Sequence, residues 1–435
     1  MDVLFSALLL FALMVGFLGA GLWIFLGLLA ISVTSLLFMG FSPTRIGTIA
    51  TKILTTSSTG WELSAIPMFV LMGEILVRST VAERLFRGLS PWVQSIPGKL
   101  LHTNVIGATI FAAVSGTSSA ATASIARITL PALRQRGYSR SIALGSLAGA
   151  GSFGLLIPPS VPLIVYGVQA EVSITKLFMA GLIPGIMLAI LYSAYIMIVA
   201  KARPGTAPDN TVSGWRDKLK ALPDLLPVSL LILAIIGAIY SGIATPSEAA
   251  AIGLLASIVI CFRSLTIARL LDALVNAAMT SAMIMSLIAT SAVLTAAMGY
   301  MHLPQELSNA IADLNLNPYM LLLLLSIFFI ILGTFMEGLS MMLMTLPFVL
   351  PMVLAAGFDP IWFGIYMVIM IELGAMTPPV GLNLFVINAV TGESIATITK
   401  ACLPFFLLMC LGLVLVILFP DIATYLPDAL SAPPR

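Results

Sequence analysis

The chain has 435 residues, of which 60% are hydrophobic and only 9% are charged, and its formal net charge is +2. Soluble globular proteins carry about a quarter charged residues. A mean hydropathy of +1.12 therefore indicates that lipid, not water, surrounds most of this chain. The small net charge and the lack of a basic tract exclude a nucleic-acid-binding protein. The three cysteines and two histidines show no spacing typical of a metal site or a disulfide.

Apolar stretches follow one another along the chain, and a membrane-spanning helix needs about 20 such residues. We predict spans near 3–18, 20–42, 60–77, 177–200, 223–241, 246–262, 279–299 and 398–420. Two long apolar stretches, 141–169 and 360–390, are interrupted, and two more, 103–134 and 318–355, are broken in the middle by small or polar residues. Segments 43–59, 78–101 and 263–277 carry scattered charges and are typical of amphipathic arms at the membrane interface. The first span lacks a basic start and a cleavage site, so we expect a retained helix rather than a signal peptide.

An internal repeat emerges when the second half of the sequence is laid over the first. At one constant offset, Leu130-Pro131 falls on Leu350-Pro351, Gly137 on Gly357, Pro158-Pro159 on Pro378-Pro379, and Pro184 on Pro404. A single offset that links a double proline to two other prolines and a glycine is hard to obtain by chance. We predict a first repeat over 1–200 with a helical hairpin near 103–134, a linker over 201–220, and a second repeat over 221–435 with a hairpin near 318–355.

The positive charges indicate that the two repeats have opposite orientations. Segment 78–100 carries four Lys or Arg residues and loop 133–140 carries three, whereas their counterparts 298–320 and 353–360 carry none. Lys and Arg collect in cytoplasmic loops. Five full crossings per repeat also require inversion, because an odd number reverses the next unit. The linker 201–220, with five Lys or Arg residues, is then cytoplasmic, and both chain ends are outside. The predicted fold class is an all-α membrane protein of two inverted five-span repeats, each with a re-entrant hairpin and a proline-broken helix.

Chemistry is expected where helices break, because backbone at membrane depth must be hydrogen-bonded or line a polar cavity. Adjacent prolines remove backbone donors and release carbonyls from the helix ladder. Hydroxyls and freed carbonyls suit Na⁺, and N–H groups at half-helix starts suit a carboxylate. The predicted ion-binding residues at the two tips and two breaks are Ser115, Gly116, Thr117, Ser118, Gly154, Ile157, Pro159, Glu337, Gly338, Glu372, Met376, Thr377 and Pro379. The predicted substrate-binding residues are Ser118, Ser119, Ser160, Ser340 and Asn383.

Four charged residues within or beside apolar stretches have open roles, because charges at membrane depth are costly and usually functional. Glu337 and Glu372 could bind a cation, carry a proton, or only accept backbone hydrogen bonds. Glu74 lies near a span end and is expected to reach the interface. Arg127, in the second arm of the first hairpin, could meet an anionic substrate, although snorkelling to the cytoplasmic face is the simpler interpretation.

Four stretches of the chain resemble the large membrane subunit of tripartite ATP-independent periplasmic (TRAP) transporters. They are SGTSSAATASIARITLPALRQRGYSRSIALGSLAGAGSFGLLIPPSVPLIVYG (115–167), AIPMFVLMGEIL (65–76), SITKLFMAGLIPG (173–185) and TPPVGLNLFV (377–386). The resemblance covers essentially the whole chain. Ser115 to Ser118 match the family's Ser/Gly-rich turn, and Gly154 to Ser160 match its proline break. Arg127 and Ala126 depart from the small residue and the glycine expected there, which bears on substrate preference.

The resemblance implies Na⁺-coupled transport by an elevator motion in a bacterial inner membrane. It also implies a periplasmic solute-binding protein that delivers the substrate, a small four-helix membrane subunit as a separate chain, and a small organic acid as the substrate. No cofactor other than the coupling ion Na⁺ is implied.

Alternative functions can be compared with this one. A stand-alone Na⁺- or H⁺-coupled permease for dicarboxylates or inorganic anions would share the repeats and hairpins but need no binding protein. A membrane-embedded enzyme is disfavoured, because no span carries a metal-binding set or a paired nucleophile and base. An ATP-driven pump is disfavoured because the chain has no GxxxxGK[ST] loop.

Overall fold

A computed structural model describes residues 9–431 apart from 11, 15, 18, 204, 209–212 and 314–316, and every regular element in these residues is a helix. The first half contains α2 (Ile24–Phe38), α3 (Pro43–Ser58), η1 (Trp61–Ser64), α4 (Ala65–Val77), α5 (Val81–Val93), α6 (Leu101–Ser115), α7 (Ser118–Gln135), α8 (Arg140–Phe153), η2 (Gly154–Leu156), α9 (Val161–Gln169) and α10 (Ile174–Ala202). The second half contains α11 (Trp215–Tyr240), α12 (Pro246–Cys261), α13 (Ile267–Tyr300), α14 (Leu303–Asp313), α15 (Pro318–Gly333), α16 (Gly338–Ala355), α17 (Pro360–Ala375), α18 (Leu382–Thr391), α19 (Ile395–Leu418) and α20 (Asp421–Ser431).

Membrane crossings are recognised from helix length and hydropathy. Among the described residues, five helices are long and apolar enough to span a bilayer: α10, α11, α13, α16 and α19. The number rises to seven if two bent pairs each count as one span, α3 with η1–α4 (bent by 60°) and α8–η2 with α9 (bent by 41°). Several shorter apolar helices pack between them. The predicted span 3–18 lies mostly outside the described residues.

Local sequence sets where these helices begin. The Asp359 carboxylate accepts hydrogen bonds from the backbone N–H groups of Ile361 and Trp362, both at 2.8 Å, and Pro360 opens α17. At α12, Thr245 and Glu248 form a reciprocal capping box, again with proline in the first turn. Both arrangements satisfy donors that a helix start leaves without partners.

Helix boundaries recur at the offset seen in the sequence. Helices α7 and α16 are each 18 residues long, and their first residues, Ser118 and Gly338, are separated by the same offset that places Pro158 on Pro378. Helices α8 and α17 begin at Arg140 and Pro360, which again occupy matching positions. The Pro158–Pro159 and Pro378–Pro379 bonds, at equal positions, are both cis.

The second half departs from the prediction at 263–277. The sequence predicts an interfacial arm there, separate from the span 279–299, but both belong to one continuous helix, α13, of 34 residues. The counterpart in the first half is interrupted at Thr59 and Gly60, between α3 and η1. No glycine or proline stands at the matching positions Met279 and Thr280, so nothing ends the helix there.

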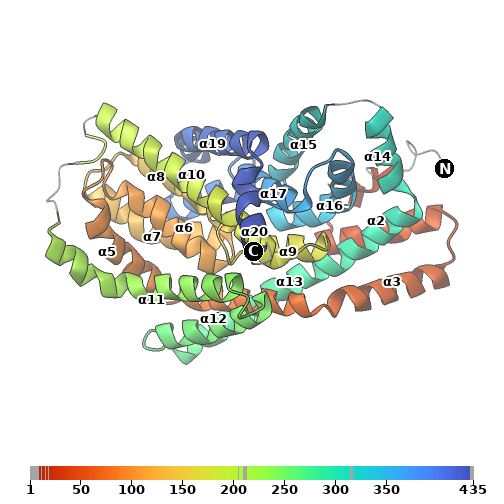
Figure 1. The fold of residues 1–435 in the computed structure, drawn as a ribbon, viewed down its shortest axis with the longest axis horizontal. Helices are drawn as coiled ribbons and strands as arrows, with labels where there is room; N and C mark the ends of the chain where they lie inside the picture. The colour runs from red at the N-terminus through yellow and green to blue at the C-terminus, as the bar shows by residue number, and fades with distance from the viewer. Residues whose placement is uncertain are drawn as a thin grey trace.

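The core lies around α17, in which every residue from Trp362 to Gly374 is buried. A helix that is apolar on all sides belongs in such an interior. Helices α8, α10, α15, α16 and α19 pack against it. In Figure 1, α11 and α12 lie along one edge of the molecule, and α15 and α19 lie along the opposite edge. The hairpin α6–α7 packs against the broken helix α8, and the hairpin α15–α16 packs against the broken helix α17.

Candidate substrate and ion site

The tip of the first hairpin is a tight turn at Gly116 and Thr117. Gly116 adopts a left-handed conformation with φ of 72°, which glycine reaches without steric cost. The Ser115 hydroxyl donates to the carbonyl of Thr117 at 3.2 Å and so braces the turn. Helix α4 lies directly behind it, since a Cβ on Gly73 would come within 2.5 Å of the Ser115 carbonyl oxygen. A Cβ on Gly116 would lie 3.2 Å from Val161, so the tip lies between α4 and the start of α9.

The first break lies between α8 and α9. Pro158 and Pro159 cannot donate to the carbonyls four residues earlier. The carbonyl of Gly154 instead accepts from the N–H of Ile157 at 3.2 Å, and Ile157 is extended. Ser160 is the N-cap residue of α9, and its buried hydroxyl has no hydrogen-bond partner among the described residues.

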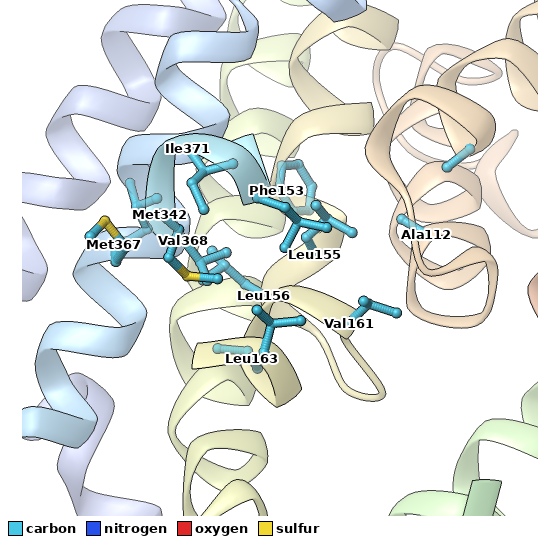
Figure 2. Close-up of a cluster of buried hydrophobic side chains, with 14 of the residues drawn as sticks. Ala112, Phe153, Leu155, Leu156, Val161, Leu163, Met342, Met367, Val368 and Ile371 are labelled. Atoms are coloured by element: carbon cyan, nitrogen blue, oxygen red, sulfur yellow. The ribbon is translucent and has the colours of Figure 1, made fainter. Parts of the chain in front are cut away.

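Apolar packing fixes this break in place. Figure 2 shows Phe153, Leu155 and Leu156 within a buried cluster that also contains Met342 of α16 and Ile371 of α17. Lipid gives no hydrophobic drive for helices to associate, so close packing must hold them. The break of the first half is therefore seated against helices of the second half.

The second break, between α17 and α18, is attached to the tip of the second hairpin. The N–H of Val380 donates to the carbonyl of Thr334 at 3.2 Å. The Thr377 hydroxyl donates to the carbonyl of Leu373 at 2.7 Å, so it caps the end of α17. Gly333 of α15 and Gly374 of α17 touch, because a Cβ on Gly374 would lie 2.7 Å from the Cα of Gly333. Small residues permit this approach of two backbones.

Four buried polar side chains meet where the first hairpin, both breaks and α18 come together. The Asn383 amide donates to the hydroxyls of Ser118 at 2.7 Å and of Ser152 at 2.8 Å. The Ser118 hydroxyl lies 3.1 Å from the Glu372 carboxylate and 3.1 Å from the carbonyl of Gly151. We call Ser118, Ser152, Glu372 and Asn383 the central cluster. It joins residues up to 265 positions apart in the chain.

The hydrogen-bond capacity of the central cluster is incomplete. One hydroxyl hydrogen on Ser118 cannot serve both Gly151 and Glu372 at once. Glu372 is 1% exposed and makes no ion pair within the described residues. The side-chain oxygen of Asn383 is buried without a hydrogen-bond donor in that part of the chain, as is the Thr122 hydroxyl. A buried carboxylate without a counter-charge is costly, and a bound cation would relieve that cost.

The second hairpin tip is organised differently. Glu337 is exposed and caps its own helix, accepting from the N–H of Ser340 at 3.1 Å. The Ser340 hydroxyl is buried and lies 3.4 Å from the same carboxylate. Gly338 packs on α17, where a Cβ would come within 2.1 Å of Ile371. Within the described residues, the side-chain hydrogen bonds of this tip stay inside the tip and do not reach the central cluster.

The structure therefore brings together three predicted site residues, Ser118, Glu372 and Asn383, and adds Ser152, which the sequence prediction omitted. Ser152 and Glu372 are separated by the same sequence offset as Pro158 and Pro378, so the predicted repeat offered a signal for Ser152. Within the described residues, the other predicted residues make no side-chain hydrogen bond to the cluster: Ser115, Gly116, Thr117 and Ser119 at the first tip, Gly154, Ile157, Pro159 and Ser160 at the first break, Glu337, Gly338 and Ser340 at the second tip, and Met376, Thr377 and Pro379 at the second break. Arg127 lies exposed on α7, away from the cluster.

A buried polar cluster held between hairpins and broken apolar helices is typical of a multi-pass membrane transporter. Comparison with known proteins identifies its family. The family model described as "Tripartite ATP-independent periplasmic transporter, DctM component" matches residues 8–422. The chain belongs to this family, and so is a TRAP transporter large permease.

Related proteins support this assignment. The chain is 35% identical over 396 residues to the C4-dicarboxylate TRAP transporter large permease protein DctM of Pseudomonas aeruginosa, covering 90% of this chain and 92% of the relative. It is 32% identical to the sialic acid TRAP transporter large permease protein SiaM of Vibrio cholerae, covering 85% and 86%. Among solved structures, the Alcanivorax borkumensis YdaH transporter aligns with a TM-score of 0.60 and 18% identity, covering 87% of this chain and 88% of that one, which shows a shared fold.

Proposed function

We propose that this chain imports a small organic acid by Na⁺-coupled secondary transport across a bacterial inner membrane. The observation that carries the proposal is the central cluster, in which Ser118 of the first hairpin meets Glu372 and Asn383 of the second half. Hydroxyl, amide and carboxylate oxygens are hard ligands of the kind that Na⁺ prefers. A cation beside Glu372 would supply the charge that the described residues lack.

Substrate recognition is proposed at the same junction. Ser160, whose hydroxyl is buried, precedes the first turn of α9, and helix starts present N–H groups that favour a carboxylate. Relatives are named for C4-dicarboxylates, sialic acid and ectoine, and all three compounds carry carboxyl groups. We therefore propose an organic acid, with C4-dicarboxylates tested first.

Transport is proposed to move one part of the chain against the other, as an elevator built on two inverted repeats. The recurrence of helix starts at matching positions, Ser118 with Gly338 and Arg140 with Pro360, supports the repeats. The two hairpins, the two breaks and α17 would form the moving part, since close glycine contacts join them. The family description, tripartite and periplasmic, supports two partners, a small four-helix membrane subunit and a periplasmic solute-binding protein.

The test is uptake of radiolabelled succinate, and then of a panel of other carboxylates, into proteoliposomes that contain this chain and its small subunit. The solute-binding protein and an inward Na⁺ gradient are each added or omitted. We expect uptake only when both are present. Uptake without the binding protein would support a stand-alone permease instead. Uptake that follows a proton gradient and ignores Na⁺ would overturn Na⁺ coupling.

A further inference from the structure

A second polar site lies outside the central cluster, in a cavity of about 850 Å³. It is bounded by the second half of α7, the start of α8 and the end of α18. Helices α7 and α18 pack together and run in the same direction, since their first turns hold Ser118 and Asn383 and their last turns line the cavity. Arg127 is nine residues beyond Ser118, about 13 Å along the helix.

The cavity is strongly basic. Its lining includes Arg127, Arg134 and Arg140 and a single carboxylate, Glu393. Glu393 is already paired, because it forms an ion pair with Arg140. Arg127 and Arg134 are exposed and make no side-chain hydrogen bond or ion pair with any described residue. Two full positive charges thus face the cavity without a counter-charge.

The geometry of these two arginines suits an anion. They stand seven residues apart on α7, which places both on one face, about 10 Å apart along the axis. The start of α8 also lines the cavity, and its N-cap residue Ser139 makes no side-chain capping bond. Guanidinium groups bind carboxylates through paired hydrogen bonds, and an uncapped helix start adds free N–H groups.

The charge pattern places this cavity on the cytoplasmic side. The loop from Leu133 to Arg140 carries three arginines, whereas the loop at the matching position in the second half carries none. Lys and Arg collect on the inner side of the membrane. An anion released from the central cluster towards the cytoplasm would pass along α7 to Arg127.

We propose that this cavity is a cytoplasmic release-side binding site for the carboxylate that the transporter moves, with Arg127 and Arg134 as its ligands. The inference rests on the proposed import of an organic acid. The same oxyanion chemistry could come from an anionic lipid headgroup, so the experiment separates these two sources.

The experiment measures ligand protection rather than transport. Exposed Gln135, at the rim of the cavity, is changed to Cys in the full chain with its small subunit, in nanodiscs of phosphatidylcholine alone or with phosphatidylglycerol. The rate of labelling by N-ethylmaleimide is followed by mass spectrometry with succinate or with neutral succinamide. Ser241→Cys, at an exposed site outside the cavity, controls for effects on the reagent.

Succinate is expected to slow labelling of Gln135→Cys in neutral lipid, whereas succinamide is not. The double change Arg127→Gln and Arg134→Gln should raise the succinate concentration needed by about tenfold, or about 1.4 kcal/mol. Arg136→Gln, an equally exposed arginine that does not line the cavity, should leave it unchanged.

Three results would overturn or separate the proposals. No protection by succinate, with succinate uptake intact, refutes the release site and leaves the proposed function standing. Protection that appears only with phosphatidylglycerol assigns the cavity to a lipid headgroup and also refutes it. Protection without uptake of any carboxylate refutes the proposed function while the anion site stands.

Discussion

The two hairpin–break units have similar backbones and different chemistry. Each unit brings a hairpin against a proline break, and the second hairpin helices α7 and α16 have the same length. At the first position of that helix, however, the first unit has Ser118 and the second has Gly338. Ser118 makes hydrogen bonds to the broken helix α8 and beyond, whereas Gly338 only packs against Ile371.

The broken helices α8 and α17 also differ in polarity, but here the second half carries the more polar residue. Ser152 in α8 corresponds to Glu372 in α17, and both belong to the central cluster. The cluster therefore combines the hydroxyl-bearing hairpin of the first half with the acidic helix of the second.

Removing the acid of the central cluster should have the largest effect. Glu372→Gln keeps the size and one hydrogen-bond acceptor but removes the negative charge that we propose binds the cation. Breaking a buried charged interaction costs about 3 kcal/mol, or roughly a hundredfold. We expect Na⁺-dependent uptake to fall by about that factor in proteoliposomes.

The matched control is Glu337→Gln, which alters the exposed acid of the second tip. Glu337 caps its own helix, so this change should reduce uptake far less. An equal loss in both variants would show that the second tip carries the cation, contrary to the asymmetry proposed here.

Overpacking the contact between the second hairpin and its break should have the next largest effect. A Cβ on Gly374 would lie 2.7 Å from the backbone of Gly333, so Gly374→Ala must push α15 from α17. Overpacking of this kind costs about 2 kcal/mol. We expect a lower midpoint of thermal unfolding and slower uptake.

The control for that change is Gly237→Ala in α11, where a Cβ would meet nothing within 4 Å. It should leave the unfolding midpoint unchanged or raise it slightly, because alanine favours a helix. If both variants behave alike, the contact between Gly333 and Gly374 does not hold the second unit together.

Removing the Ser118 hydroxyl, which joins the two halves, should have a smaller effect on transport. Ser118→Ala removes the acceptor for Asn383 and the donor shared by Gly151 and Glu372. A hydrogen bond to a charged group contributes about 1.5 kcal/mol, or roughly tenfold. We expect the Na⁺ concentration for half-maximal uptake to rise by about that factor, with the maximal rate less affected.

Ser119→Ala provides the comparison one position further along the same helix. Ser119 is only partly buried, and its side chain makes no hydrogen bond in the described structure. Its change should alter Na⁺ dependence by less than twofold. A larger effect than that of Ser118→Ala would move the ion site to the outer side of the tip.

Helix ends and breaks can be predicted from the sequence because their causes are local. The double prolines end α8 and α17 near the expected positions, and the small residues around Gly116 form the first turn. The prediction fails at 263–277, where scattered charges suggest a separate interfacial arm but the residues from Ile267 onward belong to the continuous helix α13. Scattered charges alone do not end a helix, whereas glycine and adjacent prolines do.

The central cluster can be predicted only in part. Ser118, Glu372 and Asn383 are each expected at a site, since each lies in or beside a broken apolar segment. Their pairing cannot be predicted from the sequence, because Ser118 and Glu372 are 254 residues apart and meet only through tertiary packing. Ser152 escapes prediction because a serine inside an apolar helix normally bonds back to its own turn, as Ser152 also does with Ala148 at 3.0 Å.

The smallest effect is predicted for Ser160, whose hydroxyl is the one at the two breaks that lacks a partner among the described residues. Ser160 is buried, and its counterpart at the same repeat position is Val380, so only the first break offers a hydroxyl there. Ser160→Ala should leave the free energy of unfolding within about 0.5 kcal/mol, since no hydrogen bond within the protein is lost. If the hydroxyl binds the substrate, the KM for uptake should rise about threefold at unchanged Na⁺ dependence. Val380→Ala should leave KM unchanged, and a shift in both variants would mean that the two breaks contribute equally to substrate binding.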